Sequence, residues 1–171
     1  MHDLAVGLRD LGHHPHVLSS RCGATRRSVQ DGVEVTRSMR LPEGLLRSRG
    51  FTGPLTHMPL MLRCLVGGDY DLAHAFSPAD AAVALCWRRL SGRPVVFTCV
   101  ETLRRDGLAD GRLRLSLLRA AVDDSDAVIT AGEEACAALS RWLAVEAAIM
   151  EPSDARAHEH LYRGLGGIAE R

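Results

Sequence analysis

The feature that most constrains this chain is the alternation of apolar runs with helix-like stretches along its second half. Four short runs read as strands: YDLAHAF at 70–76, RPVVFTCV at 93–100, DAVITA at 126–131 and EAAIME at 146–151. Segments with helical spacing of apolar residues separate these runs and follow the last one. Nearly uninterrupted apolar strands that alternate with helices are typical of a parallel sheet buried on both faces. We therefore expect an α/β fold with a doubly wound, mainly parallel sheet and helices on both faces.

The first half of the chain is less regular. We expect a helix over 3–12, a strand near 15–20, a polar loop over 20–32, a strand from 33, a surface loop over 41–56 and a helix over 59–68. The chain thus opens with a helix, although the first strand of a doubly wound sheet is usually central. Either the sheet closes over that gap, or the coding start has been placed too late.

Composition narrows the classes of function. The 171 residues carry 21 basic and 21 acidic side chains, so no global field favours nucleic acid or a membrane surface. The 5 cysteines are widely spaced without a CxxC pair, and we expect them to be reduced. No apolar run approaches the roughly 18 residues of a membrane-spanning helix. We expect a cytoplasmic protein with no membrane span, no nucleic-acid partner and no metal.

Several phrases in a fixed order carry a resemblance to a known family. They are HDLAVGLRDLGHHPHVLSS, DGVEVTRSMRLP, GDYDLAHAFSPADAAVALCWRRLSGRPVVFTCVET and DDSDAVITAGEEACAAL. Their order and spacing resemble the N-terminal, acceptor-side domain of GT-B fold glycosyltransferases of family 4, the glycogen-synthase-like group. The resemblance implies a Rossmann-like domain over 1–150. The segment 151–171 resembles the family's last helix, which crosses back from the second domain onto the first.

The resemblance also implies a reaction, the transfer of a sugar from a nucleotide donor to an acceptor hydroxyl. Two parts of the family pattern are missing, the first strand with its glycine-rich loop and the C-terminal donor domain. We therefore expect a truncated form that needs a separate donor-binding domain as partner and is inactive alone. The nucleotide sugar would be a donor substrate, and no cofactor is expected. The alternative is a non-catalytic remnant or accessory binding domain of the same fold, and an unrelated doubly wound binding domain is a third reading.

Two strand ends supply the candidate substrate-binding residues, since ligands of open parallel sheets bind beyond the carboxyl ends of strands. The first end gives His74 and Ser77, which precede a predicted helix start suited to a phosphate or a sugar hydroxyl. Ser77 could instead simply cap that helix, and His74 could be a satisfied buried imidazole. We predict both as ligand contacts on the strength of the resemblance.

The second strand end gives Thr98 and Glu101. The family pattern T-x-H-D places a histidine near the acceptor hydroxyl, and Val100 stands in its place here. Glu101 keeps the carboxylate and could act as a general base if burial raised its pKa. A solvated loop carboxylate is the competing interpretation, so no catalytic residue is assigned. Trp87 and Trp142 are both expected in the core.

Overall fold

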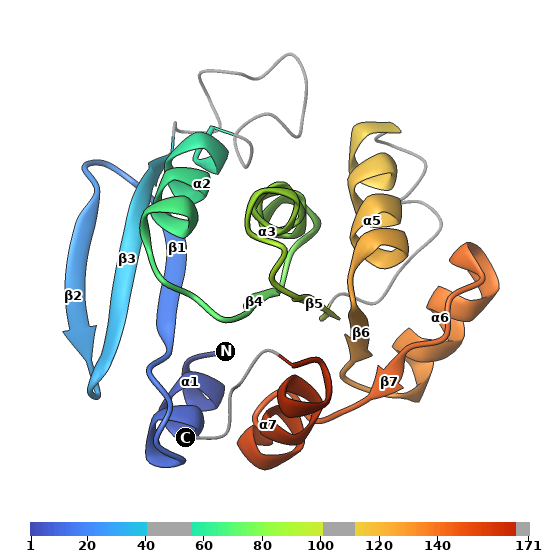
Figure 1. Ribbon diagram of the computed structural model, residues 1–171. Coiled ribbons are helices and arrows are strands. Elements are labelled where there is room, and N and C mark those ends of the chain that lie inside the picture. Colours follow the sequence, from blue (N-terminus) through green and yellow to red (C-terminus); the bar gives the residue numbers. More distant parts are fainter. Residues whose placement is uncertain (41–55, 101–111, 167–171) are drawn as a thin grey trace.

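A computed structural model describes residues 1–40, 56–100 and 112–166 of the chain. Its strands are β1 (His16–Cys22), β2 (Arg26–Gln30), β3 (Val33–Arg40), β4 (Ala73–Ala75), β5 (Val95–Cys99), β6 (Ala127–Thr130) and β7 (Ala148–Ile149). Its helices are α1 (His2–Asp10), α2 (Met58–Gly67), α3 (Pro78–Ser91), α5 (Arg112–Asp124), α6 (Glu133–Leu143) and α7 (Ala155–Gly164). Helices and a mostly parallel sheet alternate along the chain (Figure 1), which confirms the predicted α/β class.

The second half of the chain builds a parallel sheet in the order β4-β5-β6-β7. Its centre is β5, in which every residue from Val95 to Cys99 is buried. Burial on both faces explains why the sequence of this strand is almost continuously apolar instead of alternating. Because the four strands are parallel, their carboxyl ends lie along one edge of the sheet.

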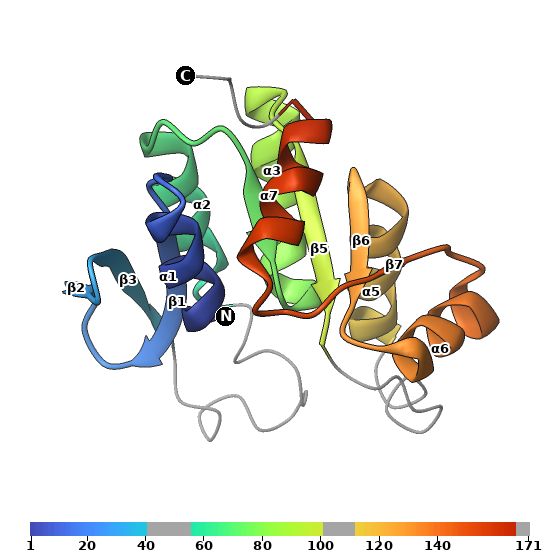
Figure 2. The ribbon, with the colours of Figure 1, turned by 90° about the horizontal axis from the view of Figure 1, so that it is seen from below.

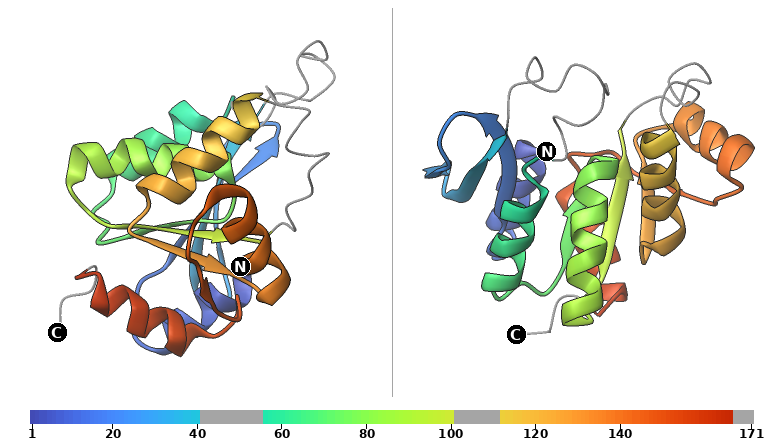
Figure 3. Two further views of the ribbon diagram at one scale, coloured as in Figure 1. Left: turned by 90° about the vertical axis from the view of Figure 1, so that its right-hand side faces the viewer. Right: turned by 90° about the horizontal axis from the view of Figure 1, so that it is seen from above.

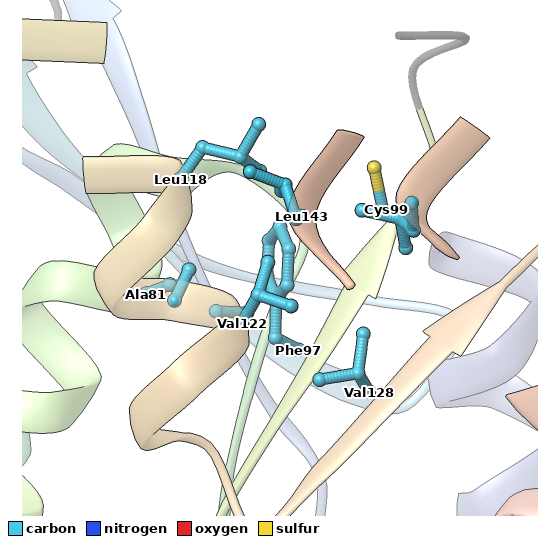
Figure 4. Packing of buried hydrophobic residues seen from close by; sticks show 10 residues of the cluster. Ala81, Phe97, Cys99, Leu118, Val122, Val128 and Leu143 are labelled. Carbon is cyan, nitrogen blue, oxygen red and sulfur yellow. The ribbon is translucent and has the colours of Figure 1, made fainter. Parts of the chain in front are cut away.

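Helices cover both faces of this sheet, α2, α3 and α5 on one side and α7 on the other (Figures 2 and 3), and α1 lies against α7, β1 and β3. Phe97 points from β5 into the first layer and packs against the α5 residues Leu118 and Val122 (Figure 4). Val96, the residue before Phe97 in the strand, faces the opposite side and joins a cluster with Ile129 and Tyr162 of α7. Adjacent residues of one strand thus anchor opposite helix layers.

The two tryptophans differ in how far they are buried. Trp87 of α3 is buried at 3% exposure, whereas Trp142 of α6 is 43% exposed. The prediction of a core position is therefore right for Trp87 and wrong for Trp142. Helix α6 lies at the end of the sheet and contributes only Leu139 and Leu143 to the core, so its remaining faces meet solvent.

The first half of the chain forms a second sheet in the order β1-β3-β2, with β1 parallel and β2 antiparallel to β3. The prediction of a loop over 20–32 is wrong, because this segment contains β2. The strand is polar and mostly exposed, so no apolar pattern reveals it. Its signal is the two-residue turn Asp31-Gly32, where both residues have positive φ and join Gln30 to its partner Val33.

The described strands form two separate sheets. They therefore do not form the single sheet that we expected to close over the place of a missing first strand. Side chains connect the two at the start of β1, where His16 Nδ1 lies 2.5 Å from the hydroxyl of Tyr70. His16 Nε2 lies 2.8 Å from Thr36 Oγ1 of β3, and burial lowers the pKa of His16.

Helix α7 also packs against α1, through a close approach at Gly7. A Cβ atom built on Gly7 would lie 2.6 Å from the Cβ of Ala155 at the start of α7, which is too close for two carbon atoms. The two helices therefore meet only because residue 7 has no side chain.

We predict that Gly7→Ala lowers the free energy of unfolding. The clash costs up to about 3 kcal/mol, which exceeds the gain of about 1 kcal/mol from replacing glycine inside a helix. Gly67→Ala is the matched control, since its added Cβ would meet nothing within 4 Å. Urea denaturation should rank Gly67→Ala above Gly7→Ala, and Ala155→Gly should rescue the latter. Equal stability of the two single variants would contradict the packing described.

Candidate functional site

The candidate site lies where β4, β5 and β6 end. Ser77 follows β4, Val100 follows β5, and Thr130 is the last residue of β6. Parallel pairing brings these ends to one edge, where ligands of open α/β sheets bind. Glu101, the predicted acceptor contact, lies outside the described residues, and its assignment stays a prediction.

His74 and Thr98 come together, but beneath α7. His74 Nε2 lies 2.6 Å from Thr98 Oγ1, and its Nδ1 lies 2.5 Å from the hydroxyl of Tyr162. The ring also stacks on Phe76 at 4.2 Å between centroids and approaches His158 of α7 at 5.6 Å. Both ring nitrogens are therefore engaged within the protein. As ligand contacts His74 and Thr98 stay predictions, and a ligand would have to displace one of these partners.

The electrostatics of this cluster favour neutral groups. Burial lowers the pKa of His74 to about 3, and nearby His158 and the amino terminus act in the same direction. Burial also raises the pKa of Tyr162. At neutral pH the cluster is thus an uncharged hydrogen-bonded contact between β4, β5 and α7, and His74 is not a proton-transfer group there.

Ser77 caps α3. Its Oγ accepts a hydrogen bond from the backbone N–H of Asp80 at 3.2 Å and donates one to Asp80 Oδ2 at 2.7 Å. The capping interpretation is therefore confirmed, while a contact with substrate stays a prediction. Asp80 contacts a further residue through its other oxygen, since Oδ1 lies 3.1 Å from Nε2 of His57.

His57 was not identified from the sequence. It directly precedes α2 and is 4% exposed. It sits just after the Pro-, Gly- and Arg-rich stretch 41–56, belongs to no motif, and reaches Asp80 across 23 positions of the chain. The sequence predicts helices over 59–68 and 78–92. Only their packing side by side could have indicated that His57 and Asp80, at the two helix starts, come into contact.

Several buried polar atoms near this edge have no hydrogen-bond partner in the part of the chain that the structure describes. They are Ser38 Oγ, His57 Nδ1 and Thr130 Oγ1, and the same holds for Ser125 Oγ and His158 Nε2 elsewhere. Folded proteins leave few buried polar groups unpaired, so each calls for an explanation. Thr130 ends β6 and His57 directly precedes α2, whereas Ser38 lies in the carboxyl-terminal half of β3, in the other sheet.

A separate crevice of about 400 Å³ lies at the opposite edge, near the starts of β1 and β3. Its polar lining includes Arg9, His13, Glu34, Asp69 and Tyr70. His13 Nε2 lies 2.9 Å from Glu159 Oε1 of α7, and this hydrogen bond lowers the pKa of Glu159. One lining residue of the crevice, His13, is thus engaged with α7.

Within 1–40, 56–100 and 112–166, no group of three or more His, Cys, Asp or Glu residues is arranged to hold a metal ion. Over the same ranges no helix is long and apolar enough to cross a membrane.

The fold is that of a Rossmann-like domain, with candidate polar groups at the carboxyl ends of its strands. Residues 1–151 match the family described as a glycosyl transferase 4-like domain, and the chain belongs to this family. The resemblance to family 4 glycosyltransferases predicted from the sequence is thereby confirmed. None of the curated proteins matches the chain.

Two solved structures of sucrose-phosphate synthase from Thermosynechococcus elongatus share the fold. The first superposes with a TM-score of 0.71 at 17% identity, over 96% of this chain and 93% of that one. The second gives a TM-score of 0.67 at 16% identity, over 92% of this chain and 45% of that one. The chain thus spans less than half of the longer enzyme chain.

The pKa of His74 predicts a pH dependence of stability. An unfolded chain protonates His74 below about pH 6.5, whereas the folded ring stays neutral down to about pH 3. The unfolded state therefore binds more protons in this window, and stability falls as the pH drops through it, by at most about 1.4 kcal/mol per pH unit from this group.

We expect His74→Gln to be less stable than the wild type at pH 7 and to lose less stability between pH 7 and pH 5. Urea unfolding at several pH values measures this, with the exposed His14→Gln as control. Parallel curves for wild type and His74→Gln would contradict the assignment of a neutral buried ring.

Proposed function

We propose that the chain is the acceptor-side domain of a glycosyltransferase, in which a sugar passes from a nucleotide donor to an acceptor hydroxyl with the help of a separate donor-binding domain. The observation that carries the proposal is the family match over residues 1–151. The extent of the structural likeness supports it, since the chain covers 93% of one sucrose-phosphate synthase chain and 45% of the longer one.

We also propose that α7 corresponds to a helix that returns from the donor domain. In the present chain α7 docks on the sheet through Tyr162 and against α1 through Ala155. This docking is what a returning helix requires.

The chemistry of the edge favours an acceptor over a donor diphosphate. The described polar groups around the ends of β4 and β6 include the hydroxyls of Ser77 and Thr130, the imidazole of His57, and the carboxylates of Asp80 and Glu133. These groups suit the neutral hydroxyls of a sugar. A diphosphate is recognised by cations and free helix N–H groups, and the start of α3 offers an acidic side chain and a proline instead.

One observation favours the alternative, a non-catalytic binding domain of the same fold. Val100 occupies the position of the histidine in the family pattern and is 49% exposed at the end of β5. An apolar side chain there can neither hydrogen-bond an acceptor nor take its proton. In this alternative the chain retains acceptor binding and has lost the catalytic step.

Calorimetric titration of the purified chain tests the proposal, with UDP-glucose, GDP-mannose and ADP-glucose in one series and D-glucose and D-fructose in the other. We expect saccharide binding, no nucleotide-sugar binding and no transfer by the chain alone. Product formation after a donor domain is added in trans would distinguish the transferase from the binding domain. Binding of nucleotide sugars but not saccharides would contradict the acceptor-side assignment, and binding of neither would overturn both functions.

A further inference from the structure

A hydrogen-bonded series links the starts of two helices at the carboxyl edge. Ser77 Oγ donates to Asp80 Oδ2 at 2.7 Å, and Asp80 Oδ1 lies 3.1 Å from His57 Nε2. Ser77 is the N-cap of α3, Asp80 lies in its first turn, and His57 directly precedes α2. The carboxylate is held by Ser77 on one oxygen, so the other oxygen has a fixed position relative to the imidazole.

This arrangement determines which ring nitrogen carries the hydrogen. A carboxylate oxygen can only accept, so Nε2 of His57 must donate to Asp80. In the neutral ring the hydrogen on Nε2 leaves Nδ1 with a lone pair, which can only accept. Asp80 thus orients His57 and presents Nδ1 as a hydrogen-bond acceptor.

No group in the part of the chain that the structure describes donates a hydrogen bond to Nδ1. The His57 side chain is 6% exposed, and Nδ1 is buried with no hydrogen-bond partner among the described residues. A buried acceptor without a partner destabilises the folded state, so an arrangement that keeps one requires a reason. If His57 served only to join the two helices, its contact with Asp80 would be enough, and an apolar atom could occupy the position of Nδ1 at lower cost.

We propose that His57 Nδ1 accepts a hydrogen bond from a hydroxyl of the sugar acceptor, and that Asp80, held by Ser77, positions the ring for it. This inference rests on the proposed function, because it names a residue of the same site. The ligand is a neutral polyhydroxylated molecule. An anion would have no donor at Nδ1 and would meet the Asp80 carboxylate nearby. Because Nδ1 is closed to solvent, the hydroxyl reaches it only when a neighbouring side chain moves aside.

Two substitutions of His57 separate the two nitrogens. Glutamine places an amide near Nε2, so His57→Gln can keep the hydrogen bond to Asp80 but lacks an acceptor at Nδ1. Asparagine places its amide near Nδ1, so His57→Asn can keep an acceptor there but loses the contact with Asp80. A purely structural role predicts that only His57→Asn is impaired, and that the impairment is in stability alone.

The experiment measures D-glucose and D-fructose affinity of the wild type and both variants, together with ¹⁵N spectra of the histidine rings. We expect free His57 to carry its hydrogen on Nε2, and saturating saccharide to shift the Nδ1 resonance. His57→Gln should keep the wild-type fold and bind saccharide about tenfold more weakly, as loss of one hydrogen bond predicts. His57→Asn should be less stable and bind within about threefold of the wild type.

A hydrogen on Nδ1 of the free protein would overturn the inference, as would wild-type affinity in His57→Gln, and in both cases the proposed function would survive. Failure of the wild type to bind either saccharide would overturn the proposed function itself and this inference with it. The two failures are distinguishable because the second appears before any variant is made.

Discussion

The fold depends on the docking of α7 onto the second face of the β4–β7 sheet. A parallel sheet must be covered on both faces, and on this side α7 buries Val96 and Ile129 beneath Tyr162. The hydroxyl of Tyr162, the ring of His74 and the hydroxyl of Thr98 form one continuous hydrogen-bonded series in this layer. The contact is specific because each polar atom has a single partner available, and it is neutral because burial keeps His74 unprotonated at neutral pH.

This docking determines where a ligand can bind. Both faces of the sheet are occupied by helices, and the predicted contacts His74 and Thr98 face α7 instead of open space. The remaining candidate position for a ligand is the carboxyl edge, where α2 and α3 begin and where His57, Ser77 and Asp80 meet. Residues within the strands and residues beyond the strand ends therefore have different roles. Phe97 and its neighbours stabilise the domain, and the residues beyond the strand ends form the candidate site.

Much of the fold and part of the candidate site were predictable from local sequence. The α/β class follows from the apolar strands and the order of segments. The position of Ser77 follows from the proline and glycine that mark the two ends of α3. Each of these signals lies within a few residues of the chain. The exposed strand β2 gave no apolar signal. The partners of His57 and His74 lie 23 and 88 positions away, and such contacts depend on how helices pack, which no local pattern encodes. Trp142 shows the same limit, since an apolar helical face is buried only where another layer covers it.

The most direct test of the account is the location of bound saccharide. Amide chemical-shift mapping with D-fructose on the ¹⁵N-labelled chain distinguishes the two edges of the sheets. We predict perturbations that centre on the carboxyl edge, at Ser77, Asp80 and Thr130, with no change around His13 and Asp69. Perturbations confined to the crevice at the opposite edge would contradict this location, because ligands of open parallel sheets bind beyond the carboxyl ends of the strands.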